Sequence, residues 1–348
     1  MILTDYKYID RAEWERLLRE SPVATWFQSA EAYEFFSSLS DIMTSFVFAV
    51  SRGNALKGVV AGYITKEKNS VKQYFTRRAI IYGGPLLAED ISDEELHELL
   101  SAVVCYLSSR AIYIETRNFN DYSRWRPMFE RCGFRYQPHL NFHVDTSSVD
   151  VIQNNLGKNR KRDIRVSLRD GARIVDNPTL EQVRDYYTIL QLLYQTKVRT
   201  PLFPWDFFQK LYDSPSSRFL LVEYESKIIG GTVCVVLDGK AIYEWFVCGE
   251  DGKYKNIFPS ELATYAGMQF AAEQGCTRFD MMGAGTPDEH YGVRDFKARF
   301  GGELVEHGRY LRINNKPLYQ VGKAGVSAIR SVNGCVRGGV VFVCISGC

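Results

Sequence analysis

The chain has 348 residues, 45% of them hydrophobic and 14% aromatic, which argues against disorder and suffices for two ordinary hydrophobic cores. Lys and Arg total 43 and Asp and Glu total 41, so the net charge is +2. This balance excludes a general nucleic-acid coat and leaves room only for local basic patches.

The beginning of the chain and its cysteines indicate a cellular compartment. Residues 1–7 show no basic region followed by an apolar core, and no stretch approaches the roughly 20 apolar residues of a membrane span. The eight cysteines form no CxxC pair and mostly lie in apolar stretches, which is typical of reduced, buried thiols. We therefore expect a soluble, cytoplasmic protein.

Two long segments show the same order of elements, namely strand, strand, strand, helix, strand, helix, strand. In the first segment these are expected at 46–51, 57–64, 78–82, 93–109, 111–115, 122–132 and 134–144. In the second they are expected at 219–223, 228–237, 241–247, 259–274, 278–281, 293–300 and 303–313. Ser92 is a plausible N-cap, and Gly133 and Gly275 are plausible helix stops.

Self-similarity of this length predicts a duplicated domain. Paired helices are expected at 180–198 and 205–212, and a basic helix at 154–168 joins the copies. The polar cluster at 146–149 places the boundary, so we expect domains at 1–146 and 147–320. Residues 321–348 form an atypical tail rich in Gly, Val and Cys.

Four short motifs carry a family resemblance. They are Thr-Trp-Phe-Gln-Ser at 25–29, the basic run at 158–165, Ile-Gly-Gly-Thr at 229–232 and Phe-Lys-Ala-Arg-Phe-Gly at 296–301. In this order and spacing they resemble the FemAB family over about residues 20–320. The resemblance implies an α/β (α+β) fold class with two tandem GNAT-type acyltransferase domains. Each would have a mixed, mostly antiparallel sheet flanked by helices.

The resemblance also implies a function. FemAB proteins are aminoacyltransferases that move amino acids from aminoacyl-tRNA onto an amine of a peptidoglycan precursor. The implied partners are such a precursor or another amine acceptor, tRNA, and the cytoplasmic membrane surface if the precursor is lipid-linked. No cofactor is implied beyond the donor, aminoacyl-tRNA or acyl-CoA, which is a co-substrate. The long helical hairpin of better-known members is not visible in this sequence.

The loop before the second long helix bears on the donor. GNAT enzymes that use acetyl-CoA hold its pyrophosphate on backbone N–H groups at a helix N-terminus. Residues 249–256 lack the corresponding glycine pattern, and Glu250 and Asp251 would repel a phosphate, whereas Lys253 and Lys255 could contact one. The sequence therefore disfavours ordinary use of acetyl-CoA.

Three cations of the basic helix are candidate substrate ligands. Lys158, Arg162 and Arg165 follow at spacings of four and three, so they share one helix face. Such a face suits the phosphates of a precursor or of tRNA, and a solvated basic helix is the alternative. Tyr243, Tyr254 and Tyr291 are further candidates for lining a substrate cleft, although aromatic residues are more often part of the core.

Lys297 is the candidate catalytic cation. Acyl transfer passes through an oxyanion that a fixed cation stabilises, and the resemblance assigns such a role to the lysine of the 296–301 motif. Asp280, which ends a strand, is the preferred general base for the attacking amine, with Asp295, Glu244 and Glu289 as alternatives.

No metal site is expected. His139 and His143 would share a strand face, but no third ligand is spaced nearby. No Ser-His-Asp arrangement, Cys-His arrangement or Walker loop appears either, which favours direct transfer in a ternary complex. Two alternatives stay open: an N-acyltransferase that uses acyl-CoA or acyl-carrier protein on a small amine, and a non-catalytic precursor-binding protein.

Overall fold

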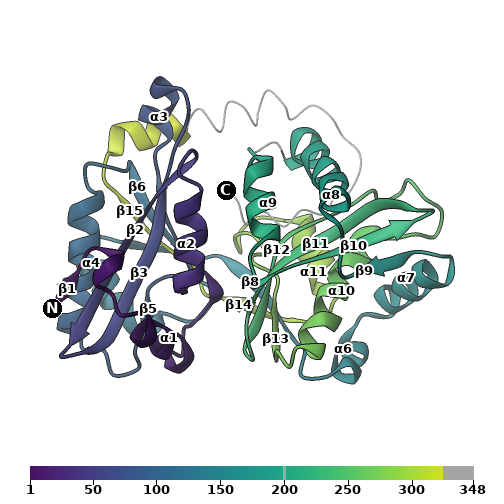
Figure 1. The fold of residues 1–348 in the computed structure, drawn as a ribbon, viewed down its shortest axis with the longest axis horizontal. Coiled ribbons are helices and arrows are strands. Elements are labelled where there is room, and N and C mark those ends of the chain that lie inside the picture. The colour runs from purple at the N-terminus through teal and green to yellow at the C-terminus, as the bar shows by residue number, and fades with distance from the viewer. Residues whose placement is uncertain (199–200, 324–348) are drawn as a thin grey trace. The chain divides into compact units, whose positions relative to one another are not determined.

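A computed structural model describes residues 1–198 and 201–323, in which the chain forms two compact units. Unit 1 comprises Met1–Pro138 together with the described residues from His307 onward, and unit 2 comprises His139–Glu306 (Figure 1). The expected continuous domains at 1–146 and 147–320 therefore differ from these units. Most of the expected tail, 321–348, lies outside the described residues.

Unit 1 is a sheet with helices on both faces. Its elements are β1 (Ile2–Leu3), α1 (Arg11–Glu20), α2 (Ala30–Ser38), β2 (Met43–Arg52), β3 (Ala55–Thr65), α3 (Ser70–Thr76), β4 (Ala79–Tyr82), β5 (Leu86–Leu87), α4 (Asp93–Leu107), β6 (Tyr113–Arg117), α5 (Arg126–Arg131), β7 (Arg135–Gln137) and β15 (Arg309–Ile313). The strand order is β1-β2-β3-β4-β6-β15-β7, with β5 paired to β3. All ladders are antiparallel except β4 with β6.

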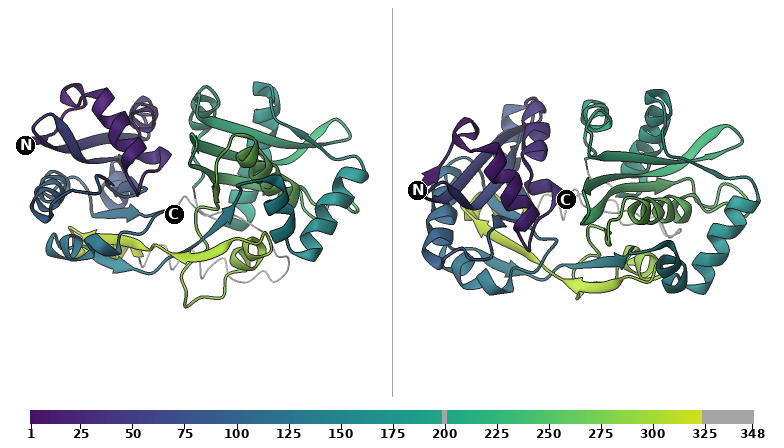
Figure 2. Two further views of the ribbon diagram at one scale, coloured as in Figure 1. Left: turned by 90° about the horizontal axis from the view of Figure 1, so that it is seen from below. Right: turned by 60° about the horizontal axis from the view of Figure 1, so that its bottom comes forward.

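Unit 2 repeats this arrangement. Its elements are β8 (Leu140–Asp145), α6 (Val149–Asn155), α7 (Lys158–Arg169), β9 (Arg173–Val175), α8 (Leu180–Leu193), α9 (Trp205–Tyr212), β10 (Ser217–Tyr224), β11 (Lys227–Leu237), β12 (Ala241–Gly249), α10 (Pro259–Glu273), β13 (Arg278–Asp280), α11 (Gly292–Ala298) and β14 (Glu303–Glu306). The strand order β9-β10-β11-β12-β13-β8-β14 mirrors that of unit 1. In Figure 2, α8 and α9 (teal) and α10 (green) lie on opposite sides of these strands.

The two copies exchange one strand each. Residues 134–144 and 303–313 were each expected to be one strand region, but each divides into two strands that belong to different sheets. β8 pairs with β13 and β14 in unit 2, whereas β15 pairs with β6 and β7 in unit 1. The sixth place of each sheet is thus filled from the other half of the chain, which makes both units discontinuous in sequence.

Local signals explain the long helices. Ser92 caps α4, with the Glu95 side chain returning to the Ser92 backbone N–H to complete a capping box. The apolar face of α4, which includes Leu99 and Val103, is fully buried against the sheet of unit 1. α10 begins at Pro259, which needs no N–H partner there, and ends before Gly275.

The 25–29 motif acts as a clamp in unit 1. Gln28 Nε2 lies 3.0 Å from the carbonyl oxygen of Gly83 and 2.9 Å from that of Gly84, to both of which it donates. Gly83 has a φ of 76°, and a Cβ there would lie 2.3 Å from Thr25 Oγ1. The glycine and the motif therefore fit each other, because only a residue without a side chain allows this approach.

Candidate active site

The candidate site of unit 2 lies where two parallel strands part. β12 pairs with β13 from Ala241 opposite Arg278 to Tyr243 opposite Asp280. β12 then continues to Gly249, whereas β13 ends at Asp280. The chain after Asp280 turns toward β8, since the Met281 N–H donates to the Phe142 carbonyl at 3.0 Å.

Asp280 sits at this point of divergence and is fully buried. Its Oδ1 accepts from Asn141 Nδ2 at 2.8 Å and from the Met282 N–H at 2.7 Å, and its Oδ2 lies 3.0 Å from His143 Nε2. Burial alone would raise the pKa of the carboxyl, but the His143 imidazole, with help from Arg278 and Asn141, holds that pKa below its ordinary value. A buried carboxylate whose pKa is lowered and whose Oδ1 already accepts two hydrogen bonds is poorly placed to take a proton from a substrate.

The loop after Asp280 has an unusual backbone. Met282 has a φ of 55° although it is not a glycine, and Gly283 follows with a φ of 119°. Left-handed geometry costs a non-glycine residue about 1 kcal/mol or more. Asn141 offsets this cost, because its Oδ1 accepts from the Gly283 N–H at 2.7 Å. The loop is therefore held in one conformation.

Lys297 binds the same loop through its carbonyl groups. Its Nζ donates to the Met281 carbonyl at 2.5 Å and to the Gly283 carbonyl at 2.6 Å, and the residue is 1% exposed. Phe296 and Phe300 are buried on either side of it in the sequence, so its short helix, α11, is anchored. The structure thus brings both predicted catalytic residues to one loop, but it presents the ammonium to backbone carbonyls rather than to solvent.

Glu244 on β12 is the charged neighbour of Lys297. It is fully buried, and burial raises the pKa of its carboxyl, whereas the Lys297 ammonium and the hydroxyls of Thr264 and Thr232 act to lower it. The pair therefore links β12 electrostatically to the loop that leaves β13. The other two alternatives for the base, Asp295 and Glu289, lie on the surface.

The start of α10 already holds a carboxylate. Asp251 accepts from the Ser260 backbone N–H at 3.1 Å and from the Ser260 hydroxyl at 2.5 Å. Gly249 lies close by, and a Cβ there would stand 2.6 Å from the Ser260 nitrogen. The N–H groups that a phosphate could use at this helix N-terminus thus face an acidic side chain.

The basic helix expected at 154–168 is found as α7, which begins only at Lys158 because residues 154–155 belong to α6. Its cations separate into two groups. Lys158, Arg162 and Arg165 are exposed as the face pattern predicts, and Arg162 also contacts Asp163 at 2.8 Å. Arg160 is 2% exposed, bonds Glu261 at 2.5 Å and lies over the rings of Phe296 and Phe300 at 4.5 and 4.6 Å. Sequence reasoning missed this structural role, although the spacing places Arg160 away from the other three cations.

The three candidate tyrosines lie in different surroundings. Tyr243 is fully buried and its hydroxyl accepts from Arg278 at 3.2 Å, so it belongs to the core. Tyr254 is partly exposed and donates to Glu250 at 3.1 Å. Tyr291 is partly exposed and packs on Gly285, where a Cβ would lie 2.9 Å from its ring. Only the latter two are accessible to a ligand.

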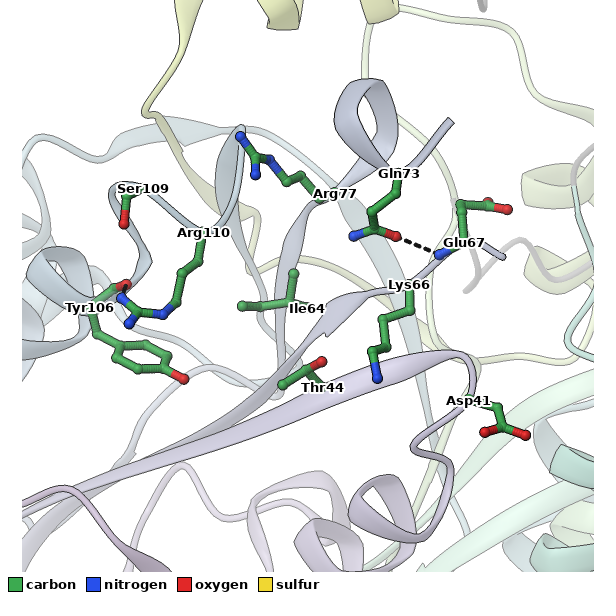
Figure 3. A pocket seen from close by; sticks show the side chains of 10 residues that line it. All are labelled: Asp41, Thr44, Ile64, Lys66, Glu67, Gln73, Arg77, Tyr106, Ser109 and Arg110. Carbon is green, nitrogen blue, oxygen red and sulfur yellow. Dashed lines mark hydrogen bonds between the residues drawn. The ribbon is translucent and has the colours of Figure 1, made fainter. Parts of the chain in front are cut away.

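A pocket of about 460 Å³ lies in unit 1 (Figure 3). Two of the cations that line it are engaged with carbonyl groups. Lys66 donates to the Ser40 carbonyl and Arg110 to the Tyr106 carbonyl, both at 2.7 Å. The pocket contains none of the residues singled out by the sequence, so we place no chemistry in it.

Within residues 1–198 and 201–323, no three His, Cys, Asp or Glu side chains gather in a way that could hold a metal ion. His139 precedes β8 rather than lying on it. None of the helices in the described ranges combines the length and apolar character that crossing a bilayer requires.

Known proteins share part of this chain's sequence and its fold. Residues 156–297 match the family model described as acetyltransferase (GNAT) domain. A segment of 88 residues, 24% of this chain, is 35% identical to the lipid II:glycine glycyltransferase of Staphylococcus saprophyticus and spans only 21% of that protein.

Solved structures show the same architecture over nearly the whole chain. The crystal structure of FemX matches with a TM-score of 0.70 and 15% identity, over 92% of this chain and 99% of FemX. L-PGS from Bacillus licheniformis matches with a TM-score of 0.55 and 16% identity, over 90% of this chain and 96% of L-PGS. A tandem GNAT protein from the clavulanic acid pathway matches with a TM-score of 0.54 and 9% identity, over 90% and 99%. The chain thus has the tandem GNAT fold of FemX.

Proposed function

We propose that this protein transfers an aminoacyl group from an ester donor, aminoacyl-tRNA, to an amine of a peptidoglycan precursor. The likeness to FemX and the local identity to a glycyltransferase that acts on lipid II support this reaction class. The observation that carries the proposal is the buried Lys297 ammonium at the place where β12 and β13 part.

Acyl transfer from an ester to an amine requires a positive electrostatic field where the strands β12 and β13 part. When an amine attacks an ester carbonyl, negative charge develops on the carbonyl oxygen, and a preorganised cation in a dry site stabilises it by several kcal/mol. Lys297 is held by two carbonyls and by α11, so its charge needs no reorganisation during the reaction. We assign it a positioning role, in which it fixes the 281–283 loop and supplies this field.

The start of α10 supports a donor other than acyl-CoA. A pyrophosphate there would meet the Asp251 carboxylate and would have to replace it on Ser260. Like charges at this distance repel each other, and the displaced cap would cost about 0.5–2 kcal/mol. An aminoacyl ester carries no pyrophosphate and so does not require Asp251 to leave the N-terminus of α10.

A second candidate is an N-acyltransferase that uses acyl-CoA, because the matched family model is an acetyltransferase domain. In either case the exposed face of Lys158, Arg162 and Arg165 is suited to a phosphate-bearing substrate, and Tyr254 and Tyr291 are accessible for stacking.

Product analysis separates these functions. The protein is incubated with a UDP-linked or lipid-linked precursor and with either charged tRNA or acetyl-CoA, and the acceptor is examined by mass spectrometry. We expect one added aminoacyl residue with charged tRNA and no product with acetyl-CoA. Acetylation would favour the second candidate, whereas precursor binding without product from either donor would indicate a non-catalytic binding protein.

A further inference from the structure

Unit 1 exposes two neighbouring aromatic side chains on α3, a helix without a role in the function described so far. Tyr74 is 50% exposed and Phe75 is 40% exposed, and their ring centroids lie 5.2 Å apart. Large apolar side chains that are exposed side by side, unlike scattered single ones, mark a binding surface. From these residues and the charges around them we infer that this end of unit 1 binds to the surface of an anionic lipid bilayer. The inference does not depend on the proposed acyl transfer.

A second helix adds to the same surface. Residues 316–323 are helical and lie beside α3 in Figure 1, where they are drawn in yellow. The two helices are close, because a Cβ at Gly322 would stand 3.9 Å from the carbonyl oxygen of Phe75. Val321, next to this glycine, is 56% exposed. The apolar groups of the surface therefore come from two segments that are far apart in the sequence.

Cations surround these apolar side chains. Residues 65–78, which include α3, contain five Lys or Arg and a single acidic residue, Glu67. Lys68 is exposed in this segment, and Lys316 and Lys323 are exposed on the second helix. Each Lys or Arg near an anionic bilayer strengthens binding by about five-fold. Since the apolar groups are few, these cations supply the second signal that stable attachment to a bilayer needs.

The pocket of Figure 3 adjoins α3 and suits the phosphate of a lipid headgroup, as a binding site rather than a reaction site. Gln73 and Arg77 line it together with Lys66 and Arg110, and its lining includes three cations and two acidic residues. Arg77 lies 5.4 Å from the ring centroid of Tyr74, and its Nε is buried without a hydrogen-bond acceptor within residues 1–198 and 201–323. A phosphate oxygen is a strong acceptor for such a guanidinium N–H.

Two other kinds of partner fit this surface less well. The cores of protein interfaces are depleted of Lys, whereas lysines stand beside the apolar groups of both helices here. A nucleic acid would bind the cations and stack its bases on aromatic rings, but Val321 offers no ring for stacking. In a bilayer, aromatic and aliphatic side chains enter the apolar layer while Lys and Arg reach the headgroups. The combination therefore favours a lipid surface.

The test measures binding of the whole protein to lipid vesicles by co-sedimentation. We expect binding to vesicles of equal parts phosphatidylglycerol and phosphatidylcholine, and at least about 10-fold weaker binding to phosphatidylcholine alone. Raising the salt concentration from about 0.1 M to about 1 M shortens the Debye length from about 10 Å to about 3 Å and should weaken the binding. Equal binding to both kinds of vesicle, or binding to neither, would overturn the inference.

One double variant tests the aromatic side chains. Tyr74→Ala with Phe75→Ala should lower the partition coefficient for the anionic vesicles by about 10-fold or more, because both rings lose their contact with the apolar layer. The control is Tyr8→Ala, which removes another aromatic side chain of unit 1 that is 66% exposed. An effect of equal size in the double variant and the control would overturn the assignment of this surface.

A second double variant tests the cations. Lys68→Gln with Lys316→Gln removes one exposed charge from each of the two segments and should also lower the partition coefficient by about 10-fold or more. The control is Arg131→Gln with Arg135→Gln, which removes two exposed charges from α5 and β7. Loss of binding that follows the number of charges removed, wherever they lie, would contradict a localised surface.

A measurement on the wild type needs no substitution. Hydroxyl radicals oxidise exposed aromatic rings, and peptide mass spectrometry follows each ring separately. Anionic vesicles should protect Tyr74 and Phe75 and leave Tyr8 as reactive as before. Protection of the two rings by tRNA but not by vesicles would overturn the inference in favour of a nucleic-acid surface.

Discussion

Replacement of Lys297 by Met is the perturbation whose effect the structure predicts most fully. The ammonium donates to the Met281 and Gly283 carbonyls, and its removal leaves both oxygens without this donor in a buried place. A hydrogen bond to a charged group contributes about 1.5–3 kcal/mol, so the two together amount to about 3–6 kcal/mol of unfolding free energy. At about 2–4 °C per kcal/mol for a domain of this size, the melting temperature should fall by roughly 6–24 °C.

The loss should also depend on pH, because Glu244 loses its cationic neighbour. The folded-state pKa of Glu244 already lies above its ordinary value of 4.5, which means that the folded state binds the proton more tightly than the unfolded state does. Without Lys297 this pKa rises further. The Lys297→Met variant should therefore lose more stability at neutral pH than near pH 4, where Glu244 is protonated in both states.

The assay is thermal unfolding followed by circular dichroism at about pH 4 and pH 7.5, values chosen to lie below and well above the ordinary glutamate pKa. The double variant Lys297→Met with Glu244→Gln should recover the pH-dependent part of the loss, and Lys255→Met, at an exposed position, should change nothing. Turnover is measured below the variant's melting temperature. A Lys297→Met protein that melts within about 2 °C of wild type at both pH values would refute the conclusion that the buried ammonium stabilises the 281–283 loop.

Three further predictions concern other charged groups. Arg160→Met should lower the unfolding free energy of unit 2 by about 3–5 kcal/mol, since it leaves the Glu261 carboxylate buried without its partner. The double variant Arg160→Met with Glu261→Leu should recover much of this loss of stability, as measured by urea unfolding. Arg117 and Arg309 hold the pKa of the buried Glu115 at about 2, below the ordinary 4.5, so its contribution of about 3 kcal/mol to the unfolding free energy is present above pH 4.5 and lost as pH falls toward 2. Glu115→Gln should therefore weaken the dependence of the unfolding free energy of unit 1 on pH between these values. An unchanged pH dependence would contradict the pairing. Charge reversal at the exposed Arg162 and Arg165 should raise the KM for the precursor and leave the melting temperature within about 2 °C of wild type, whereas unchanged kinetics would remove this face from substrate binding.

Much of the fold could be predicted from the sequence because its signals are local. The N-cap at Ser92, the start of α10 at Pro259 and the apolar runs of β2, β3 and β11 all lie where the pattern places them. The exchange of β8 and β15 could not be predicted, because periodicity identifies a strand but not its partner. Pro138 and Gly308, the latter with a φ of 63°, mark the breaks within the two strand regions, and these were the signals available.

In the candidate site, too, the sequence indicates residues but not their spatial partners. The sequence identified Lys297 and Asp280, and the structure brings both to the 281–283 loop. Whether such side chains face solvent or backbone depends on long-range packing, which a single sequence does not contain. His143 shows this plainly, since its partner Asp280 lies on a distant strand, and only the register of β8 with β13 joins them.

Transfer of a labelled amino acid tests the proposed function most directly. The amino acid on charged tRNA carries the label, the precursor carries a free amine, and the linkage formed is followed over time. The proposed function predicts an amide-linked label on the precursor, formed by wild type at a rate that Lys297→Met reduces by at least about 10²-fold. Label that appears only as free amino acid, or transfer that proceeds equally well from acyl-CoA, would contradict it.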